Sequence, residues 1–246
     1  MVRVGSGGEK TIKIAATADV HARVGDTKRL HTLVQGASRE ADVLVIGGDL
    51  TDLGQPEQAE ILIEVLDTCR VPIVAILGNH DYESGGADAL SHLFVEAGVH
   101  LLNRSSVVIG GVGFSGVKGF CGGFEGAAAD SFGEDLFKAW VDEGILEAKA
   151  LKSELRGLGT ERRVAVLHYS PIRATVEGEP PEIHAFLGTS HLARALDGGG
   201  AAVAFHGHAH QGSFRGKTPG GVPVFNVSEP VLEQEGFRRP YFVIEV

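Results

Sequence analysis

The sequence has few cysteines and no long apolar run, and each shortage excludes a class of protein. Cys69 and Cys121 are the 2 cysteines, so a disulfide framework is excluded and we expect two reduced thiols. The longest apolar segment, residues 72–77, is far shorter than the roughly 18 residues of a membrane-spanning helix. Residues 1–10 are polar and glycine-rich with no apolar stretch, which predicts neither export nor anchoring, and therefore a cytoplasmic protein.

Basic charge is also scarce. The chain has 22 Lys and Arg against 32 Asp and Glu, a formal net charge of −10. A surface this acidic repels polyanions, which disfavours nucleic acid as a partner. A small phosphate compound stays compatible if a metal ion supplies positive charge locally. Association of identical copies is neither required nor excluded by the composition.

Glycine, by contrast, is abundant, and much of it follows short apolar runs rich in β-branched residues. Such runs are typical of strands that helices cover on both faces. Stretches with apolar residues at helical spacing separate several of them. The pattern predicts a mixed β core with helices outside, as two facing sheets in one α/β domain. The predicted strands are residues 12–17, 43–46, 73–77, 164–167 and 201–205, and the predicted helices are residues 26–41, 56–69, 87–97, 131–158 and 190–196.

One segment stands apart from this alternation. We expect residues 1–246 to form a single domain in which residues 113–158, a glycine-rich loop followed by a long helix, are a candidate cap or lid. The loop also contains Lys118 and Phe120, an odd composition for a mere linker. Aromatic rings stack on bases and lysine binds phosphate, so we predict that these two side chains contact substrate. A flexible surface loop is the alternative.

Each predicted strand is followed by Asp, Asn or His. Because ligands of open α/β folds bind at the carboxyl ends of strands, we expect these side chains to converge at one edge. Asp19 and His21 are two residues apart, so in an extended backbone they point the same way and can bind one ion. His208 and His210 have the same spacing. Glycines at 48, 78 and 207 directly precede candidate ligands, where a close approach of the backbone would exclude a Cβ.

The candidate ligands outnumber the four positions of one tetrahedral ion. They comprise carboxylates, an amide and imidazoles, with no thiolate. This set suits two ions with mixed nitrogen and oxygen ligands, such as Mn²⁺, Zn²⁺ or Fe²⁺/Fe³⁺. The candidates are Asp19, His21, Asp49, Asn79, His168, His208 and His210.

Five motifs follow one another along the chain: Asp19-x-His21, Gly48-Asp49-x-x-Asp52, Gly78-Asn79-His80-Asp81, His168 and Gly207-His208-x-His210. In order and approximate spacing they resemble the motifs of the calcineurin-like metallophosphoesterases, in particular small bacterial phosphodiesterase-type members. The resemblance implies a four-layer α/β/β/α sandwich of two mixed β-sheets flanked by helices. It also implies that a hydroxide bridging the two ions attacks phosphorus. By the same resemblance, the first ion is held by Asp19, His21, Asp49 and His210, and the second by Asp49, Asn79, His168 and His208.

The resemblance further implies two catalytic residues that hold no metal. His80 would contact the phosphate and protonate the leaving alkoxide. Asp81 would keep that imidazole oriented and cationic. Both follow directly after the candidate ligand Asn79.

We therefore predict a metal-dependent phosphoester hydrolase, in particular a phosphodiesterase acting on a small phosphodiester such as a cyclic nucleotide. The leaving group of a diester departs as an alkoxide, and an acid such as His80 is needed to protonate it. A monoester dianion would favour an arginine clamp, and no arginine lies within the five motifs. The alternatives are a phosphomonoesterase of broad specificity, a nuclease, and a metal-stabilised interaction module.

Overall fold

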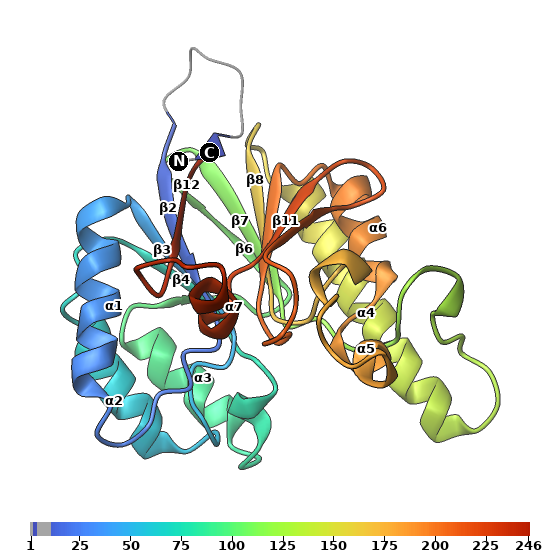
Figure 1. The fold of residues 1–246 in the computed structure, drawn as a ribbon, viewed down its shortest axis with the longest axis horizontal. Helices are drawn as coiled ribbons and strands as arrows, with labels where there is room; N and C mark the ends of the chain where they lie inside the picture. The colour runs from blue at the N-terminus through green and yellow to red at the C-terminus, as the bar shows by residue number, and fades with distance from the viewer. Residues whose placement is uncertain (1, 4–10) are drawn as a thin grey trace.

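The computed structural model of the chain describes residues 2–3 and 11–246 (Figure 1). Most of residues 1–10, on which the expectation of no export signal rests, lies outside the described residues. The described strands form two six-stranded sheets. The first has the order β1 (Val2–Arg3), β12 (Phe242–Glu245), β2 (Lys13–Thr17), β3 (Val43–Gly47), β4 (Ile73–Ile76) and β5 (His100–Leu101). The second has the order β10 (Arg215–Lys217), β11 (Pro223–Asn226), β9 (Val203–His206), β8 (Arg163–Leu167), β7 (Val112–Val117) and β6 (Ser105–Ile109).

Both sheets mix parallel and antiparallel pairs. In the first sheet, β2 to β5 run parallel while β12 pairs with β2 antiparallel. In the second, β7, β8, β9 and β11 run parallel, and β6 and β10 are antiparallel edges. The parallel strands therefore end at the same edge of each sheet, which is where the sequence has its polar motifs.

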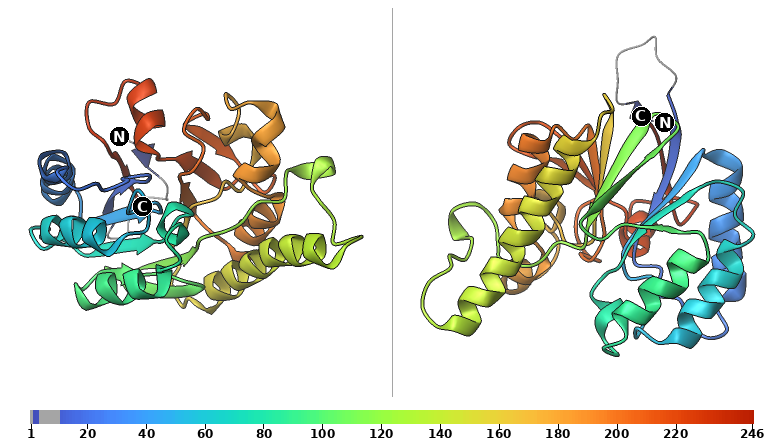
Figure 2. Two further views of the ribbon diagram at one scale, coloured as in Figure 1. Left: turned by 90° about the horizontal axis from the view of Figure 1, so that it is seen from below. Right: turned by 180° about the vertical axis from the view of Figure 1, so that it is seen from behind.

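Helices cover the outer face of each sheet (Figures 1 and 2). The first sheet carries α1 (Thr27–Glu40), α2 (Pro56–Leu66) and α3 (Ala87–Glu96), and the second carries α4 (Asp135–Gly157) and α6 (Ser190–Gly199). Shorter turns complete the chain: α5 (His184–Leu187), α7 (Glu229–Gln234), η1 (His80–Tyr82), η2 (Glu125–Ala127), η3 (Arg173–Thr175) and η4 (Pro181–Ile183). The predicted four-layer α/β/β/α sandwich is confirmed. Among the described residues, no helix has both the length and the apolarity needed to cross a bilayer.

Alternation along the strands separates the core into layers. In β2, Ile14 and Ala16 face the second sheet, whereas Ala15 packs under the helices of the first. Phe114 and Phe205 of the second sheet fill the space between the sheets and are fully buried. The central strands, such as β3, β4 and β9, are thus covered on both faces, which is why their sequences are apolar. The edge strands β6 and β10 are partly exposed and carry polar residues.

The expectation that residues 113–158 begin with a loop is wrong for residues 113–117, which belong to the buried strand β7. The glycines there permit close packing between layers. A Cβ on Gly116 would lie 2.7 Å from Cβ of Leu102 and 2.8 Å from Cγ2 of Ile76. Glycine content alone therefore did not distinguish a turn from a tightly packed strand. A lid role for the rest of the segment stays a prediction.

Helix α4 offers a test of this packing. Leu155 is fully buried against α6 and the second sheet, so Leu155→Ala should lower the free energy of unfolding by about 2–5 kcal/mol. Leu146, on the same helix, is 49% exposed, and Leu146→Ala should change the free energy of unfolding by about 0.5 kcal/mol or less. Urea denaturation measures both. Equal losses would contradict the assignment of the buried face of α4.

Candidate metal centre and active site

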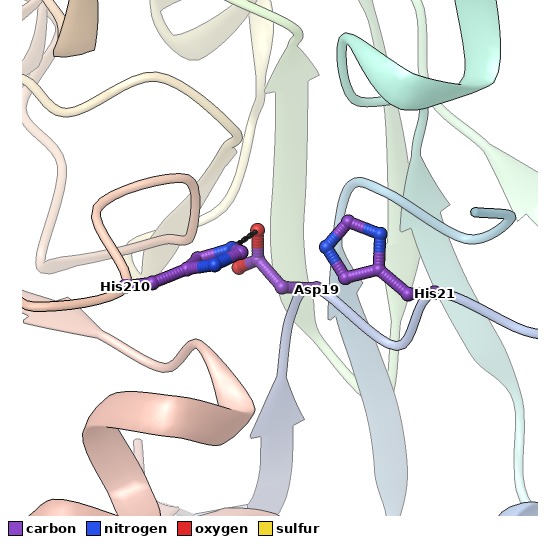
Figure 3. A group of neighbouring side chains, drawn as sticks. All are labelled: Asp19, His21 and His210. Atoms are coloured by element: carbon purple, nitrogen blue, oxygen red, sulfur yellow. Dashed lines mark hydrogen bonds and ion pairs between the residues drawn. The ribbon is translucent and has the colours of Figure 1, made fainter. Parts of the chain in front are cut away.

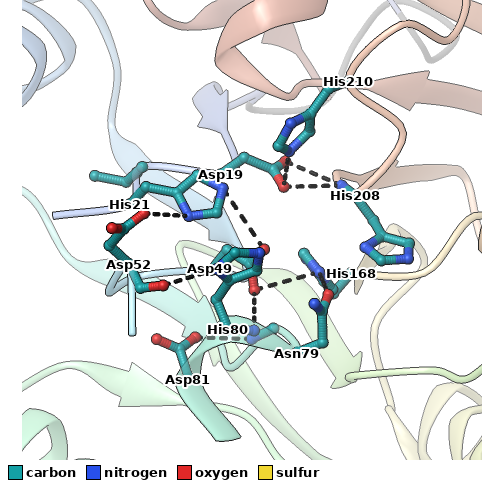
Figure 4. Close-up of polar contacts among 12 residues, drawn as sticks. Asp19, His21, Asp49, Asp52, Asn79, His80, Asp81, His168, His208 and His210 are labelled. Atoms are coloured by element: carbon teal, nitrogen blue, oxygen red, sulfur yellow. Dashed lines mark hydrogen bonds and ion pairs between the residues drawn. The ribbon is translucent and has the colours of Figure 1, made fainter. Parts of the chain in front are cut away.

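Five loops bring the candidate ligands together, and each follows the carboxyl end of a parallel strand (Figure 4). The loops after β2, β3 and β4 come from the first sheet, and those after β8 and β9 come from the second. Backbone hydrogen bonds connect neighbouring loops: Asp19 N donates to Gly48 O at 3.0 Å, and Gly207 N donates to His168 O at 3.2 Å. The predicted convergence at one edge is confirmed.

A first group joins Asp19 and His21, from the loop after β2, with His210, from the loop after β9 (Figure 3). Nε2 of His210 lies 2.9 Å from Oδ1 of Asp19. One donor atom from each of the three residues lies within 4.8 Å of the other two. Both sheets thus contribute to a cluster whose spacing suits a bound cation.

Asp49 lies between two imidazoles. Its Oδ2 is 3.7 Å from Nε2 of His21, and its Oδ1 is 3.4 Å from Nε2 of His168. That nitrogen of His168 also lies 2.8 Å from Oδ1 of Asn79. Asp19, Asp49 and His168 form a further group with donor atoms within 4.8 Å of one another. Asp49 therefore contacts expected ligands on both of its sides.

His208 is the expected ligand whose imidazole stands outside these groups. Its Nε2 lies 3.3 Å from the carbonyl oxygen of Phe186. Its ring packs beside those of His168 and Tyr169, with centroids 4.9 and 4.4 Å away. Its backbone N donates to both carboxylate oxygens of Asp19 at 3.0 Å. His208 therefore orients Asp19 through its backbone, and metal ligation by its ring stays a prediction.

In the loops that carry the candidate ligands, several residues have backbone conformations that residues other than glycine rarely adopt. The φ angles of Asp19, His21, Asp49 and His208 are +58°, +43°, +50° and +71°. A residue with a Cβ in this left-handed region costs about 1–2 kcal/mol. Such strain persists only where the surroundings determine it, and it is concentrated at functional sites.

The glycines before the ligands allow close approach, as predicted. A Cβ on Gly207 would lie 2.1 Å from Oδ2 of Asp19, and a Cβ on Gly78 would lie 2.1 Å from Oδ1 of Asp49. A Cβ on Gly48 would overlap an imidazole. Since atoms cannot approach this closely, any side chain at these positions would displace a candidate ligand.

The two buried carboxylates have opposite pKa shifts. Burial favours the neutral form of Asp19, but the hydrogen bond with His210 and the neighbouring imidazoles outweigh it and lower its pKa to about 2. Burial, together with the negative charge of Asp19, raises the pKa of Asp49 to about 9. An ionised Asp49 therefore needs further positive charge in the site.

The imidazoles offer lone pairs rather than that charge. Burial lowers the pKa of His21 and of His208 to about 4, and lowers the pKa of His168 well below its ordinary value. The exception is His210, whose hydrogen bond to Asp19 raises its pKa. Both ring nitrogens of His21 are buried without a hydrogen-bond partner. Unpaired imidazole nitrogen beside buried carboxylate is the donor chemistry of Mn²⁺, Fe²⁺ and Zn²⁺ sites, so these residues fit such ions.

His80 faces the same cluster. Its Nδ1 lies 2.7 Å from the carbonyl oxygen of Asp52, and since a carbonyl only accepts, Nδ1 carries the proton. Its ring meets that of His21 edge-on at 4.5 Å between centroids. Its backbone N donates to Oδ1 of Asp49 at 2.9 Å. One of its ring nitrogens also lies within 4.8 Å of donor atoms of His21 and Asp49.

Asp81 does not orient His80, so that expectation is wrong. The fully buried Asp81 carboxylate accepts hydrogen bonds from N and Oγ1 of Thr51, at 2.8 and 2.6 Å, and from the backbone N of Leu50 and Gly78. These bonds use the lone pairs that an imidazole would need. Asp81 instead fixes the loop after β3, which carries the candidate ligand Asp49. The contact that orients His80 comes from the backbone carbonyl of Asp52.

Lys118 and Phe120 line a cavity of about 550 Å³ that reaches Asn79. Their contact with substrate stays a prediction, but both lie beside a candidate ligand. Tyr82 and Tyr169 line the same cavity, and the sequence analysis did not identify them. The available signal was position, because each lies within two residues of a motif histidine.

A family model described as calcineurin-like phosphoesterase matches residues 12–212, which include all five motifs. The chain belongs to the calcineurin-like phosphoesterase family. This confirms the predicted family and the predicted class, that of metal-dependent phosphoester hydrolases.

Three proteins illustrate what this calcineurin-like phosphoesterase is similar to. The glycerophosphodiester phosphodiesterase GpdQ of Enterobacter lignolyticus (strain SCF1) is 32% identical over 69 residues, 28% of this chain and 24% of that protein. The match thus spans about a quarter of that curated relative. The phosphopantetheinyl hydrolase (PptH) of Mycobacterium tuberculosis has a TM-score of 0.66 at 18% identity, covering 95% of both chains. TT1561 of Thermus thermophilus has a TM-score of 0.60 at 16% identity, covering 90% of this chain and 91% of the other. At these identities the two structures show a shared fold.

Gly207→Ala tests whether backbone clearance positions Asp19. The added Cβ would displace the carboxylate, and we expect Mn²⁺ affinity to fall about 10–100-fold, the usual effect of losing support for a ligand. Isothermal titration with Mn²⁺ measures this. Gly157→Ala is the control, because a Cβ there meets nothing within 4 Å. Unchanged Mn²⁺ affinity in Gly207→Ala would contradict the geometry.

Proposed function

We propose that this chain is a dinuclear metal-dependent phosphodiesterase acting on a small phosphodiester. The observation that carries the proposal is the position of Asp49. One of its oxygens faces His21 and the other faces His168, so a single carboxylate adjoins two groups of donor atoms. Buried carboxylates are stable when they are paired or coordinate metals.

The ligand sets follow from these groups. Asp19, His21, His210 and Asp49 would hold one ion, and Asp49, Asn79, His168 and His208 the other. When bound, two such cations lower the pKa of water between them and neutralise charge on the phosphoryl oxygens. Mn²⁺, Zn²⁺ and Fe²⁺/Fe³⁺ all suit this donor set.

His80 is the residue that would move a proton. Its Nδ1 donates to the carbonyl oxygen of Asp52, which leaves Nε2 as the ring atom able to hold or release a proton. Delivered to the departing oxygen, that proton would prevent the build-up of alkoxide charge. The contact with Asp52 fixes the orientation of the His80 ring, so that Nε2 faces the same way in each cycle.

Three observations support a small diester over a monoester. Arg23, the arginine adjoining the first motif, is bound to Asp52 at 2.9 Å, and its side chain is 65% exposed. It therefore does not provide the buried clamp that a dianion would favour. The cavity beside Asn79, at about 550 Å³, lies within the ordinary size of a small-molecule site, which has room for a small diester such as a cyclic nucleotide. The curated relative is a glycerophosphodiester phosphodiesterase by name.

The direct test compares bis(4-nitrophenyl) phosphate with 4-nitrophenyl phosphate after chelation and reloading with Mn²⁺. We expect metal-dependent turnover with a higher kcat/KM for the diester. A higher value for the monoester would replace the proposal with the phosphomonoesterase alternative. Absence of turnover on both with Mn²⁺, Zn²⁺ and Fe²⁺ would overturn it in favour of an interaction module.

Asp49→Asn should loosen both ions, because one carboxylate would neutralise two cations. We expect fewer than two ions per chain by native mass spectrometry and loss of most of the diester turnover. Asp67→Asn, on the exposed end of α2, is the matched control and should keep both. Two retained ions together with near-native turnover would contradict the bridging assignment.

His80→Ala should keep both ions while kcat falls about 10²–10⁴-fold, the range for a lost general acid. The deficit should be smallest for 4-nitrophenol, which leaves without protonation, and larger for alkyl leaving groups. Steady-state kinetics on aryl and alkyl diesters measures the difference. An equal deficit for both would rule out His80 as the proton donor.

A further inference from the structure

The cavity beside Asn79 is lined by residues next to the ligand motifs, including Tyr82 and Tyr169, and by three segments that carry none of them. The turn after β5 contributes Asn103 and Arg104, α4 contributes Glu143 and Glu147, and the segment after β7 contributes Lys118 and Phe120. The cavity therefore spans from the end of β4, at the candidate metal centre, to the helical layer outside the second sheet.

The ammonium group of Lys118 is held inside a frame of three aromatic rings. Its Nζ lies 4.8 Å from the ring centroid of Phe120, 5.1 Å from that of Tyr169 and 5.4 Å from that of Tyr82. Cation–π attraction at these distances favours the charged form and fixes the position of the group. Burial opposes this and lowers the pKa of Lys118. The cation is thus oriented in advance at a partly desolvated position.

The carboxylates of the cavity are already engaged. Arg104 forms ion pairs with Glu143 and with Glu147, the latter at 2.6 Å between Nε and Oε1. The second oxygen of Glu147 accepts a hydrogen bond from Gly119 N at 2.7 Å. Nζ of Lys118 donates to Gly119 O at 3.1 Å, and within residues 11–246 no carboxylate oxygen lies within 4.0 Å of it. An ammonium has three donors, so Lys118 has capacity for an added acceptor.

The ring of Tyr169 lies near both Lys118 and two of the candidate metal ligands. Its ring centroid lies 4.4 Å from that of His208, 5.6 Å from that of His168 and 5.1 Å from Nζ of Lys118. A ligand whose reacting phosphoryl group lies at the metal centre would reach Lys118 by passing one aromatic ring. A chain of a few atoms spans that length.

We propose that the cavity selects phosphoesters that carry a second phosphate group, which Lys118 binds while the reacting phosphate lies at the metal centre. The inference rests on the proposed function and names the substrate class of the same site. Lysine binds phosphate as a point charge. The neighbouring amide of Asn103 and the phenol groups of Tyr82 and Tyr169, which line the same cavity, are further hydrogen-bond donors for its remaining oxygens.

A matched pair of substrates tests this. The two esters are 4-nitrophenyl 3-methoxypropyl phosphate and 4-nitrophenyl 3-phosphonooxypropyl phosphate. Both release 4-nitrophenol, but only the phosphonooxypropyl ester carries a second phosphate group. We expect the Mn²⁺-loaded protein to prefer the second ester in kcat/KM. Lys118→Met should reduce that preference about tenfold or more, as for the loss of a charged hydrogen bond. Turnover of the methoxypropyl ester, which has no second phosphate, should fall less than turnover of the phosphonooxypropyl ester. Circular dichroism of the variant reports whether it is folded.

Two further variants complete the design. Lys118→Arg keeps the charge and should retain part of the preference. Lys149→Met removes an exposed lysine of α4 and should retain all of it. Equal losses on both esters in Lys118→Met, or an unchanged preference, would overturn the inference. Hydrolysis of both esters by the unaltered protein without preference would also overturn it while sparing the phosphodiesterase proposal, whereas hydrolysis of neither would overturn both.

Discussion

Asp49 has a buried carboxylate whose two oxygens face imidazoles from opposite directions, and the organisation of the site follows from that position. His21 approaches one oxygen from the first sheet, and His168 approaches the other from the second. Burial and the nearby charge of Asp19 raise the pKa of Asp49 to about 9, so the ionised form requires positive charge that these largely neutral imidazoles do not supply. Metal cations would meet this requirement, and they would give a chain of net charge −10 a local attraction for phosphate.

The sandwich fold supports this arrangement at a cost in backbone energy. Two sheets with their parallel strands ending at one edge bring five loops within reach of one another. Those loops place Asp19 and His208 in left-handed conformations, and glycines such as Gly207 let ligands approach the backbone. The fully buried layer between the sheets, with Phe114 and Phe205 at its centre, provides the stability that offsets the strain. Asp81 contributes by fixing the loop after β3.

The site was predictable from sequence to the extent that its chemistry lies in local motifs. Asp19 and His210 are 191 residues apart yet 2.9 Å from each other, and their meeting followed from the rule that parallel strands end at one edge. Contacts that depend on side-chain direction were not predictable. Asp81 bonds to Thr51 rather than to the neighbouring His80, and Gly116 packs in a strand rather than a loop. Tyr169 was missed because an aromatic residue beside a buried strand is ordinarily core.

Anomalous X-ray diffraction from crystals of the Mn²⁺-loaded protein would show whether Asp49 joins two ions, because it locates each ion without reference to activity. We expect two manganese peaks, one on the His21 side of Asp49 and one on the His168 side, with an Asp49 oxygen bonded to each. A single peak, or two peaks of which neither contacts Asp49, would contradict it.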